Sequence, residues 1–349
     1  MKWHKLSIRM GTLAILVAML LRFALSGALG NAWDIFAQPE LASFLIYSET
    51  GRIPQATAAE GTTAPTQTIP TVPAPTSPIP TDPIPTDPKP IVPDPIIKPV
   101  FSKTDTQLFS LTYSFNLRNK PDVPKLLMQQ LSWDLTENAP TVLILHSHAS
   151  EAYTKTADSQ YENLAAYRTT DERYNMVSIG AELARLLEAQ GIQVIHDRTA
   201  YDFLDYDNAY DKARVSIQQY LKEYPSIKLV IDLHRDSAAN ADGSQWASKA
   251  TVNGKDAAQM MLVVGTNGSG QAHPNWQTNL SIAEKMAVLV EKENDGVCRP
   301  IQVRYKRYNQ DLCPGSLIVE LGSAGNTHQQ AMNTVPALAD AIIALAKGT

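Results

Sequence analysis

The stretch Val142-Leu-Ile-Leu-His146-Ser-His148-Ala-Ser-Glu151 joins four apolar residues to a cluster of polar ones. A continuous apolar run of this length is typical of a strand that is buried on both faces. Two histidines and a glutamate follow where such a strand would end in a loop, and imidazole and carboxylate groups are common ligands of zinc. The stretch therefore predicts a buried strand with a metal site at its carboxyl end.

Two later stretches repeat this arrangement. Leu229-Val-Ile-Asp232-Leu-His234-Arg235-Asp236 places a histidine at the end of an apolar run, and Leu317-Ile-Val-Glu320-Leu-Gly322 places a glutamate in one. Segments with apolar residues three or four positions apart separate these runs and predict amphipathic helices. We expect strands at 141–145, 192–196, 228–233, 258–264 and 317–321, and helices at 175–190, 209–224, 279–293 and 333–347.

Short apolar strands that alternate with amphipathic helices favour an α/β fold, with a mainly parallel central sheet and helices on both faces. In such sheets the ligand site lies beyond the carboxyl ends of the strands. The three polar clusters stand at these ends, so we expect them to meet in one site.

The composition excludes several classes of function. The chain of 349 residues has a formal net charge of -5, whereas nucleic-acid binding requires a basic face, so we expect no nucleic-acid partner. Two cysteines, Cys298 and Cys313, do not make a disulfide framework. The sequence also contains no nucleophile elbow, no phosphate-binding P-loop and no glycine-rich dinucleotide fingerprint.

The N-terminus predicts a membrane anchor at residues 1–33. Three basic residues precede the apolar stretch 10–21, which Arg22 separates from a second, mostly apolar stretch. Basic residues before such a segment keep the N-terminus in the cytoplasm and place the remainder on the extracytoplasmic side. A cleaved signal peptide is the alternative, because the charge-free core is short.

Three further segments follow the anchor. Residues 34–56 form a juxtamembrane segment with weak helical character. Residues 57–100 are a linker rich in proline, with repeats of Pro-Ile-Pro-Thr-Asp-Pro, which we expect to be disordered and extended. Residues 101–349 contain all the predicted sheet strands and form the catalytic domain.

The candidate metal ligands are His148, Glu151 and His234. Three protein ligands with a fourth position open to water are the pattern of a catalytic zinc site. The spacing His-x-x-Glu brings His148 and Glu151 to the same side of a turn and favours Glu151 as the third ligand. Asp171 and Glu172, which stand just before the helix at 175–190, are the rival source of that ligand.

Glu320 is the candidate catalytic residue. A charged residue in a buried strand is costly unless it is paired or used. Beside a metal ion, Glu320 would accept a proton from the attacking water and pass it to the leaving amine. The alternative is a structural ion pair with an arginine such as Arg304 or Arg307.

Three neighbouring side chains are candidates for support or substrate binding. His146 is two positions before His148 and so faces the same side of an extended segment, as a support for the ligands or a stabiliser of the oxyanion. Asp236 or Asp232 would orient the His234 ring from behind. Arg235 would bind a substrate carboxylate, or form a structural ion pair.

At these residues the sequence resembles the stage II sporulation protein P family of cell-wall hydrolases. The resemblance covers the layout of anchor, linker and C-terminal domain. It rests on His146-Ser-His148-Ala-Ser-Glu151-Ala-Tyr153, Asn175-Met-Val-Ser-Ile-Gly180, Asp232-Leu-His234-Arg235-Asp236, Tyr308-Asn309-Gln310-Asp311-Leu312, and Glu320-Leu-Gly322 with Asn326-Thr327. More distantly, the pattern is similar to zinc-dependent N-acetylmuramoyl-L-alanine amidases.

The resemblance implies a zinc enzyme that cuts the stem peptide from N-acetylmuramic acid in peptidoglycan during sporulation engulfment, with endopeptidase activity as well. It implies two partners: a lytic transglycosylase, the stage II sporulation protein D, and a membrane scaffold, protein M. The catalytic domain would then lie in the intermembrane space of a sporulating cell.

The resemblance also implies that His148 and His234 bind zinc and that Glu320 is catalytic. The related amidases take their third ligand from a carboxylate just before a helix, as at Asp171 or Glu172, but we adopt Glu151 on its spacing. Two alternative functions stay open. One is an endopeptidase or carboxypeptidase with the same zinc site, and the other is an inactive anchored domain that binds the cell wall or a partner.

Overall fold

The structure is a computed structural model and describes residues 96–349. The predicted anchor at 1–33, the segment 34–56 and residues 57–95 of the predicted linker lie outside the described residues. Within residues 96–349, no helix combines the length and the apolar character needed to cross a bilayer.

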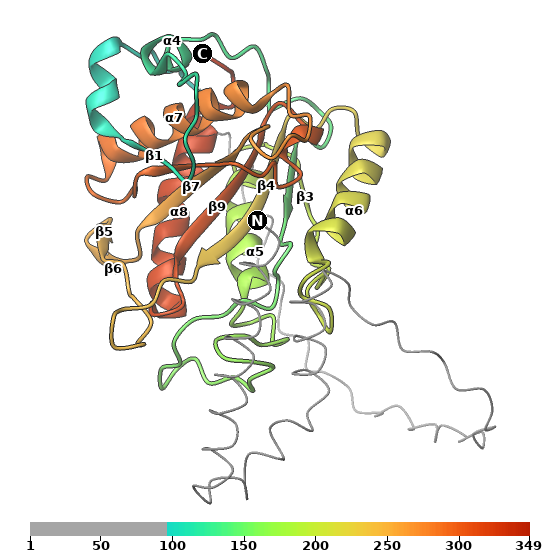
Figure 1. Ribbon diagram of the computed structural model, residues 1–349, viewed down its shortest axis with the longest axis vertical. Coiled ribbons are helices and arrows are strands. Elements are labelled where there is room, and N and C mark those ends of the chain that lie inside the picture. The colour runs from blue at the N-terminus through green and yellow to red at the C-terminus, as the bar shows by residue number, and fades with distance from the viewer. Residues whose placement is uncertain (1–95) are drawn as a thin grey trace, which may run out of the picture. The chain divides into compact units, whose positions relative to one another are not determined.

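A seven-stranded sheet forms the centre of the described residues, in the strand order β1-β8-β7-β9-β4-β2-β3 (Figure 1). All neighbouring strands run parallel except β7 and β9, which pair antiparallel. The predicted α/β class and the mostly parallel sheet are thus confirmed. The strands are β1 (Leu111–Tyr113), β2 (Val142–Leu145), β3 (Val194–His196), β4 (Leu229–Asp236), β7 (Met260–Gly265), β8 (Ile301–Arg304) and β9 (Ser316–Ser323).

The reversal at β7 divides the sheet into two groups of strands. Strands β3, β2, β4 and β9 end at one edge, while β1, β8 and β7 end at the opposite edge. The strands that carry the three polar clusters belong to the first group. Strand β9 is the last of the seven in chain order, yet it occupies the middle of the sheet.

Helices cover both faces of the sheet. Alternate residues of each strand point to opposite faces, so the apolar side chains of one strand pack against helices on both sides. Val142 and Ile144 belong to the large hydrophobic cluster that includes residues of α5, α7 and α8, whereas Leu143 and Leu145 pack with α6. A short β5–β6 hairpin lies apart from the main sheet. The remaining elements are η1 (Lys103–Leu108), α4 (Val123–Leu127), α5 (Met176–Glu188), α6 (Ala209–Glu223), β5 (Ala250–Val252), β6 (Lys255–Ala257), α7 (Trp276–Glu293), η2 (Gln310–Leu312) and α8 (His328–Leu345).

Helix α7 buries two charged residues next to each other in sequence, Glu284 and Lys285. The Lys285 ammonium donates hydrogen bonds to the carbonyl of Leu126 and the hydroxyl of Ser281. Within the part of the chain that the structure describes, neither carboxyl oxygen of Glu284 has a hydrogen-bond partner. Burial raises the pKa of Glu284 to about 8 and lowers the pKa of Lys285 to about 8.

Glu284→Gln is therefore expected to stabilise the fold increasingly as pH rises. The unfolded chain releases the Glu284 proton near its ordinary pKa of 4.5, whereas the folded chain keeps it until about pH 8. Between these values the folded state binds more protons, so the free energy of unfolding falls with rising pH, by about 1 kcal/mol per pH unit. Glutamine removes this loss. Urea unfolding of both proteins across this range measures the difference, and parallel pH profiles would contradict the prediction.

Candidate metal centre

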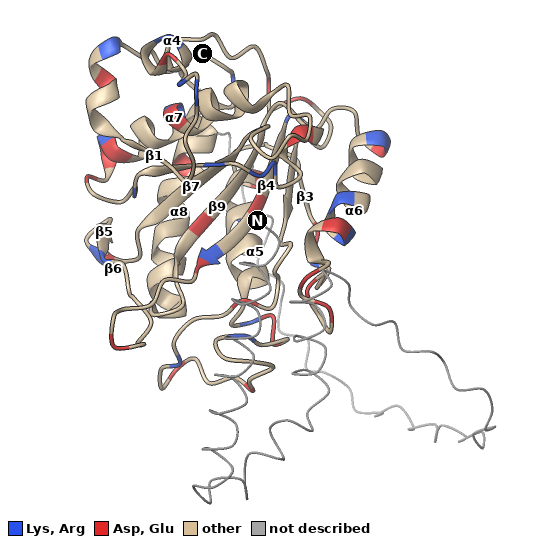
Figure 2. Cartoon of the chain, in the orientation of Figure 1, with Lys and Arg blue, Asp and Glu red and all other residues tan. Residues whose placement is uncertain are grey.

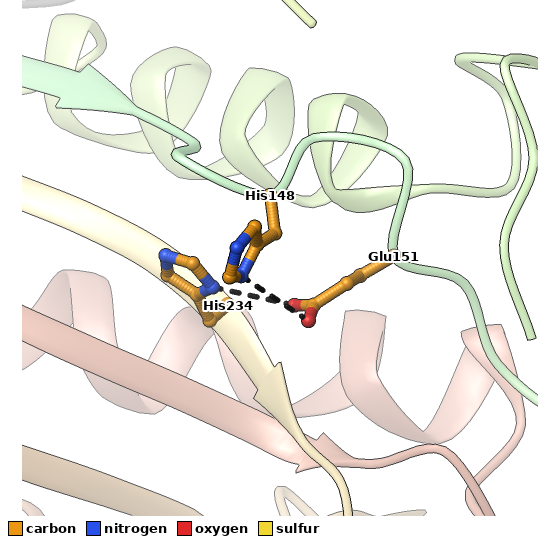
Figure 3. Close-up of side chains that lie close together, drawn as sticks. All are labelled: His148, Glu151 and His234. Carbon is orange, nitrogen blue, oxygen red and sulfur yellow. Dashed lines mark ion pairs between the residues drawn. The ribbon is translucent and has the colours of Figure 1, made fainter. Parts of the chain in front are cut away.

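The three predicted ligands come from the ends of two adjacent parallel strands. Strand β2 ends at Leu145, and the turn that follows carries His148 and Glu151. Strand β4 lies beside β2 and carries His234 near its own carboxyl end. The side chains of His148, Glu151 and His234 point toward one another (Figure 3).

The geometry of this group suits a single metal ion. His148 Nδ1 lies 3.7 Å from Glu151 Oε1, and His234 Nδ1 lies 3.3 Å from Glu151 Oε2. One ligand atom from each residue falls within 4.8 Å of the others, and all three side chains are buried. Ligands at bond lengths of about 2 Å around a tetrahedral ion are about 3.3 Å apart. The spacing and the donor types of these side chains therefore fit zinc.

Asp232 and Ser147 fix the orientation of the His234 ring. Its Nε2 lies 2.8 Å from Asp232 Oδ1 and 2.8 Å from Ser147 Oγ, and Ser147 also donates to Asp232 through its amide and its hydroxyl. This leaves Nδ1 of His234 facing Glu151. A carboxylate behind a histidine ligand is a common support of metal sites. Asp232 holds this position rather than Asp236, which pairs with Arg299 at 2.6 Å.

The pKa values of the three side chains differ in direction from their ordinary values. Burial lowers the pKa of His148 to about 4, so its ring is neutral, the form that binds a metal. Burial alone would also lower the pKa of His234, but Asp232 and Glu151 outweigh it and raise that pKa well above its ordinary value. Burial would raise the pKa of Glu151, yet His234 lowers it to about 2. Glu151 is therefore ionised, as a ligand must be.

Glu320 lies beside His234, because the two residues are direct partners in the β4–β9 register. Figure 2 shows acidic residues in β4 and β9, two strands that are otherwise mostly uncharged. Oε2 of Glu320 is buried and has no hydrogen-bond partner among the described residues, and burial raises the pKa of Glu320 to about 8. Among residues 96–349, no arginine or lysine forms an ion pair with it, and Arg307 pairs with Asp311 instead. The alternative of a structural ion pair finds no support.

Two tyrosines missed by the sequence interpretation enclose His148. The ring of Tyr206 stacks on the imidazole, with centroids 4.2 Å apart and planes at 15°, and Tyr210 meets it edge-on at 5.4 Å. The Arg168 guanidinium lies over the Tyr206 ring, 3.9 Å from its centroid, and comes within 3.8 Å of Glu151 Oε1. No signal in the sequence marks these residues, since they lie far along the chain from His148.

His146 does not join the group, for a reason visible in strand geometry. His146 is two positions after Ile144 and so points to the same face of the sheet, toward α5. His148 lies in the turn beyond the strand. Its Nδ1 lies 2.9 Å from the carbonyl of Leu233 and its Nε2 lies 2.9 Å from His196. The ring is fully buried under Gly180, where an added Cβ would come within 2.6 Å of it. The expectation that His146 and His148 face the same side was wrong.

Arg235 and the rival carboxylates are engaged elsewhere. The buried Arg235 guanidinium donates to the carbonyls of Ala152, Tyr167 and Asp236, and so ties the loop after β2 to β4. Its donors are thus used by main-chain groups and not by an ion pair. Asp171 is paired with Arg173, and Glu172 with Arg198. Neither belongs to the group of ligand atoms.

A sequence model of the family described as stage II sporulation protein P (SpoIIP) matches residues 100–343. The chain belongs to this family. The stage II sporulation protein P of Bacillus subtilis (strain 168) is 26% identical over 216 residues, which cover 59% of this chain and 51% of the relative. The chain thus spans about half the length of that relative. The family resemblance read from the motifs is confirmed.

Two solved structures with weaker likeness are amidases. The CwlD amidase from Clostridioides difficile, in complex with the GerS lipoprotein, has 13% identity and a TM-score of 0.34, over 58% of this chain and 96% of that one. The N-acetylmuramoyl-L-alanine amidase AmiC2 of Nostoc punctiforme has 14% identity and a TM-score of 0.33, over 58% of this chain and 94% of that one.

Proposed function

We propose that this chain is a zinc-dependent peptidoglycan hydrolase that cleaves the amide between N-acetylmuramic acid and the stem peptide, during sporulation engulfment. One observation carries the proposal: the ligand atoms of His148, Glu151 and His234 converge within 4.8 Å, beside a glutamate whose buried oxygen has no partner. Membership of the stage II sporulation protein P family supports the cell-wall substrate.

Each residue has a distinct task in this proposal. His148, Glu151 and His234 hold the ion, and Asp232 keeps the His234 ring in its ligand orientation. When bound, zinc supplies a Lewis acid for the scissile carbonyl and makes water a better nucleophile near neutral pH. Glu320 accepts the proton of the attacking water at Oε2 and returns it to the departing amine. A carboxylate in this place can take the proton from water and pass it on to the amine in the next step.

The proposed location rests on the N-terminal sequence, and the proposed partners rest on the family resemblance. We propose that residues 1–33 anchor the chain, that residues 57–100 act as a spacer, and that the catalytic domain 101–349 works on the extracytoplasmic side of the membrane. Peptidoglycan is the proposed substrate. The lytic transglycosylase stage II sporulation protein D and the scaffold protein M are the proposed protein partners.

Digestion of purified muropeptides by the zinc-loaded chain, resolved by mass, tests the reaction. An amidase releases an intact stem peptide and leaves the lactyl carboxyl of muramic acid free. Cleavage between two amino acids of the peptide would instead assign an endopeptidase with the same site. A chain that binds zinc stoichiometrically and releases neither product would be a binding domain, and the proposal would fail.

A comparison of three variants tests the third ligand. Glu151→Ala is expected to weaken zinc affinity by more than about a hundredfold, because the loss of a ligand exceeds the effect of an outer-shell partner. Asp171→Ala and Glu172→Ala should retain it, since each carboxylate faces an arginine at the surface. Zinc content after dialysis against a weak chelator gives the ranking. Loss of zinc from either control, with Glu151→Ala unaffected, would transfer the ligand role to that residue.

A further inference from the structure

The motif Tyr308-Asn309-Gln310-Asp311-Leu312 has no part in the reaction proposed above, yet its backbone is unusual. Tyr308 and Asn309 both adopt left-handed conformations, with φ of 50° and 60°. Asparagine tolerates this region, but for tyrosine it costs free energy. Such a conformation persists only where surrounding contacts impose it.

One set of contacts fixes the motif to the sheet. Gln310 is buried, with 1% of its surface exposed. Its Oε1 accepts from the amide of Gly265 at 2.8 Å and its Nε2 donates to the carbonyl of Val263 at 2.9 Å. The motif is therefore held at the end of β7 like an additional strand neighbour.

A second set of contacts binds the motif to the first turns of α6. Asn309 Nδ2 donates to the carbonyl of Tyr210 at 2.7 Å. Arg214, one turn along the helix, donates to Asn309 Oδ1 at 3.3 Å and to both oxygens of Asp311 at 2.8 and 2.7 Å. The ring of Tyr308 also packs against Tyr210, with centroids 5.7 Å apart. We call Tyr308 and Asn309 the clasp.

The residue held by the clasp reaches the metal centre. The ring of Tyr210 is edge-on to His148 at 5.4 Å and parallel to His234 at 6.2 Å, with planes at 7°. Both separations lie in the range of favourable aromatic pairs. On its other side Tyr210 packs with Tyr308 against a cluster of Met261, Val263 and Ile318. The ring is thus fixed between the body of the sheet and two candidate ligands.

We propose that Tyr210, held by the clasp, is a positioning residue that fixes the His148 and His234 rings in the orientation required of ligands. The inference rests on the proposed function only for the identity of the ion. Ligand geometry tolerates errors of about 0.5 Å and 10–20°. Asp232 and Ser147 constrain one nitrogen of His234, but among the described residues no hydrogen bond to the His148 ring is found, so that ring depends on aromatic contacts.

Asn309→Gly tests the clasp without substituting any residue of the metal centre. Glycine adopts the left-handed backbone without steric strain and removes the side-chain amide. Asn253→Gly is the matched control, because Asn253 also has a positive φ, of 51°, and lies exposed in the turn of the β5–β6 hairpin. Both variants are made in the full chain, and their melting temperatures establish that each is folded.

The first measurement needs no metal. Long-range ¹H–¹⁵N spectra of the histidine side chains are expected to show shifted or broadened signals for His148 and His234 in Asn309→Gly, and unchanged signals for His146 and His196. Asn253→Gly should match the wild type throughout. Unchanged His148 and His234 signals, or equal changes in all four histidines, would overturn the proposal.

The second measurement is zinc affinity, by competition with a chromogenic chelator. Asn309→Gly is expected to lose about tenfold, as outer-shell substitutions do, and Tyr210→Phe should stay near wild type because it keeps the ring. If Tyr210→Phe bound zinc as weakly as Tyr210→Ala, the effect would belong to the hydroxyl and the proposal would be overturned. A wild type that binds no zinc would refute the proposed function, while the metal-free spectra would still decide whether Tyr210 positions the two rings.

Discussion

Glu320→Gln is expected to lower the rate of peptidoglycan cleavage by on the order of 10²- to 10⁴-fold while zinc affinity and melting temperature stay near those of the wild type. Glutamine has nearly the same size and shape as glutamate, so packing in β9 survives. Its amide cannot accept a proton from water or return one to the leaving amine. No ion pair is lost either, because the structure pairs Glu320 with no arginine or lysine of the described residues.

Glu284→Gln is the matched control for this result. Both carboxyl oxygens of Glu284, like Oε2 of Glu320, are buried without a hydrogen-bond partner among the described residues, and burial raises both pKa values to about 8. Glu284, however, lies on α7 and outside the metal centre. It should therefore retain full turnover. If Glu320→Gln loses activity only in proportion to a fall in melting temperature, Glu320 is structural and the proposed mechanism fails.

His148→Ala and His234→Ala are expected to lose zinc and activity together. Each substitution removes one of three protein ligands, which should weaken zinc affinity by more than the roughly hundredfold upper range of an outer-shell change. His234→Ala also leaves Asp232 and Glu151 without their shared partner, so it should lower the melting temperature as well. Zinc content, melting temperature and muropeptide cleavage are measured on one preparation of each variant.

His273→Ala controls for the loss of a buried imidazole. His273 is 2% exposed and its ring nitrogens have no partner, but it does not belong to the ligand group. It should keep stoichiometric zinc whatever happens to its stability. Stoichiometric zinc in both His148→Ala and His234→Ala would show that the ligands lie elsewhere.

The central strands were predictable because burial on both faces leaves a continuous apolar run. All four residues of β2 are buried, and the predicted strand at 141–145 differs from it by one residue. Strand β8 was missed because its buried and half-buried residues alternate, so Gln302 and Arg304 interrupt the apolar pattern. The reversed direction of β7 was also missed, because a six-residue run reads the same in a parallel and an antiparallel pair.

The candidate site was predictable where a polar residue interrupts an apolar strand, as His234 and Glu320 do. Such a residue is costly in a core and so signals a use. The supports of the site were less predictable. Tyr210 reaches His148 only through the tertiary fold, and Arg235 serves main-chain carbonyls that no sequence pattern reveals. The orientation of His146 could have been predicted from the alternation of side chains in β2 if the turn after Leu145 had been recognised.

The place of β9 in the sheet governs when the site can form during synthesis. Strands β4 and β7 flank it on either side, so a ribosome that has released residues only up to about 315 has delivered both histidines but no strand to join the two halves. Contacts between such distant segments form late and slowly. A nascent chain can therefore pair β2 with β4, the strands that carry the three ligands, but it lacks Glu320 until β9 emerges and inserts. In the mechanism proposed above, the chain would therefore gain its proton-transferring carboxylate only after β9 has been made.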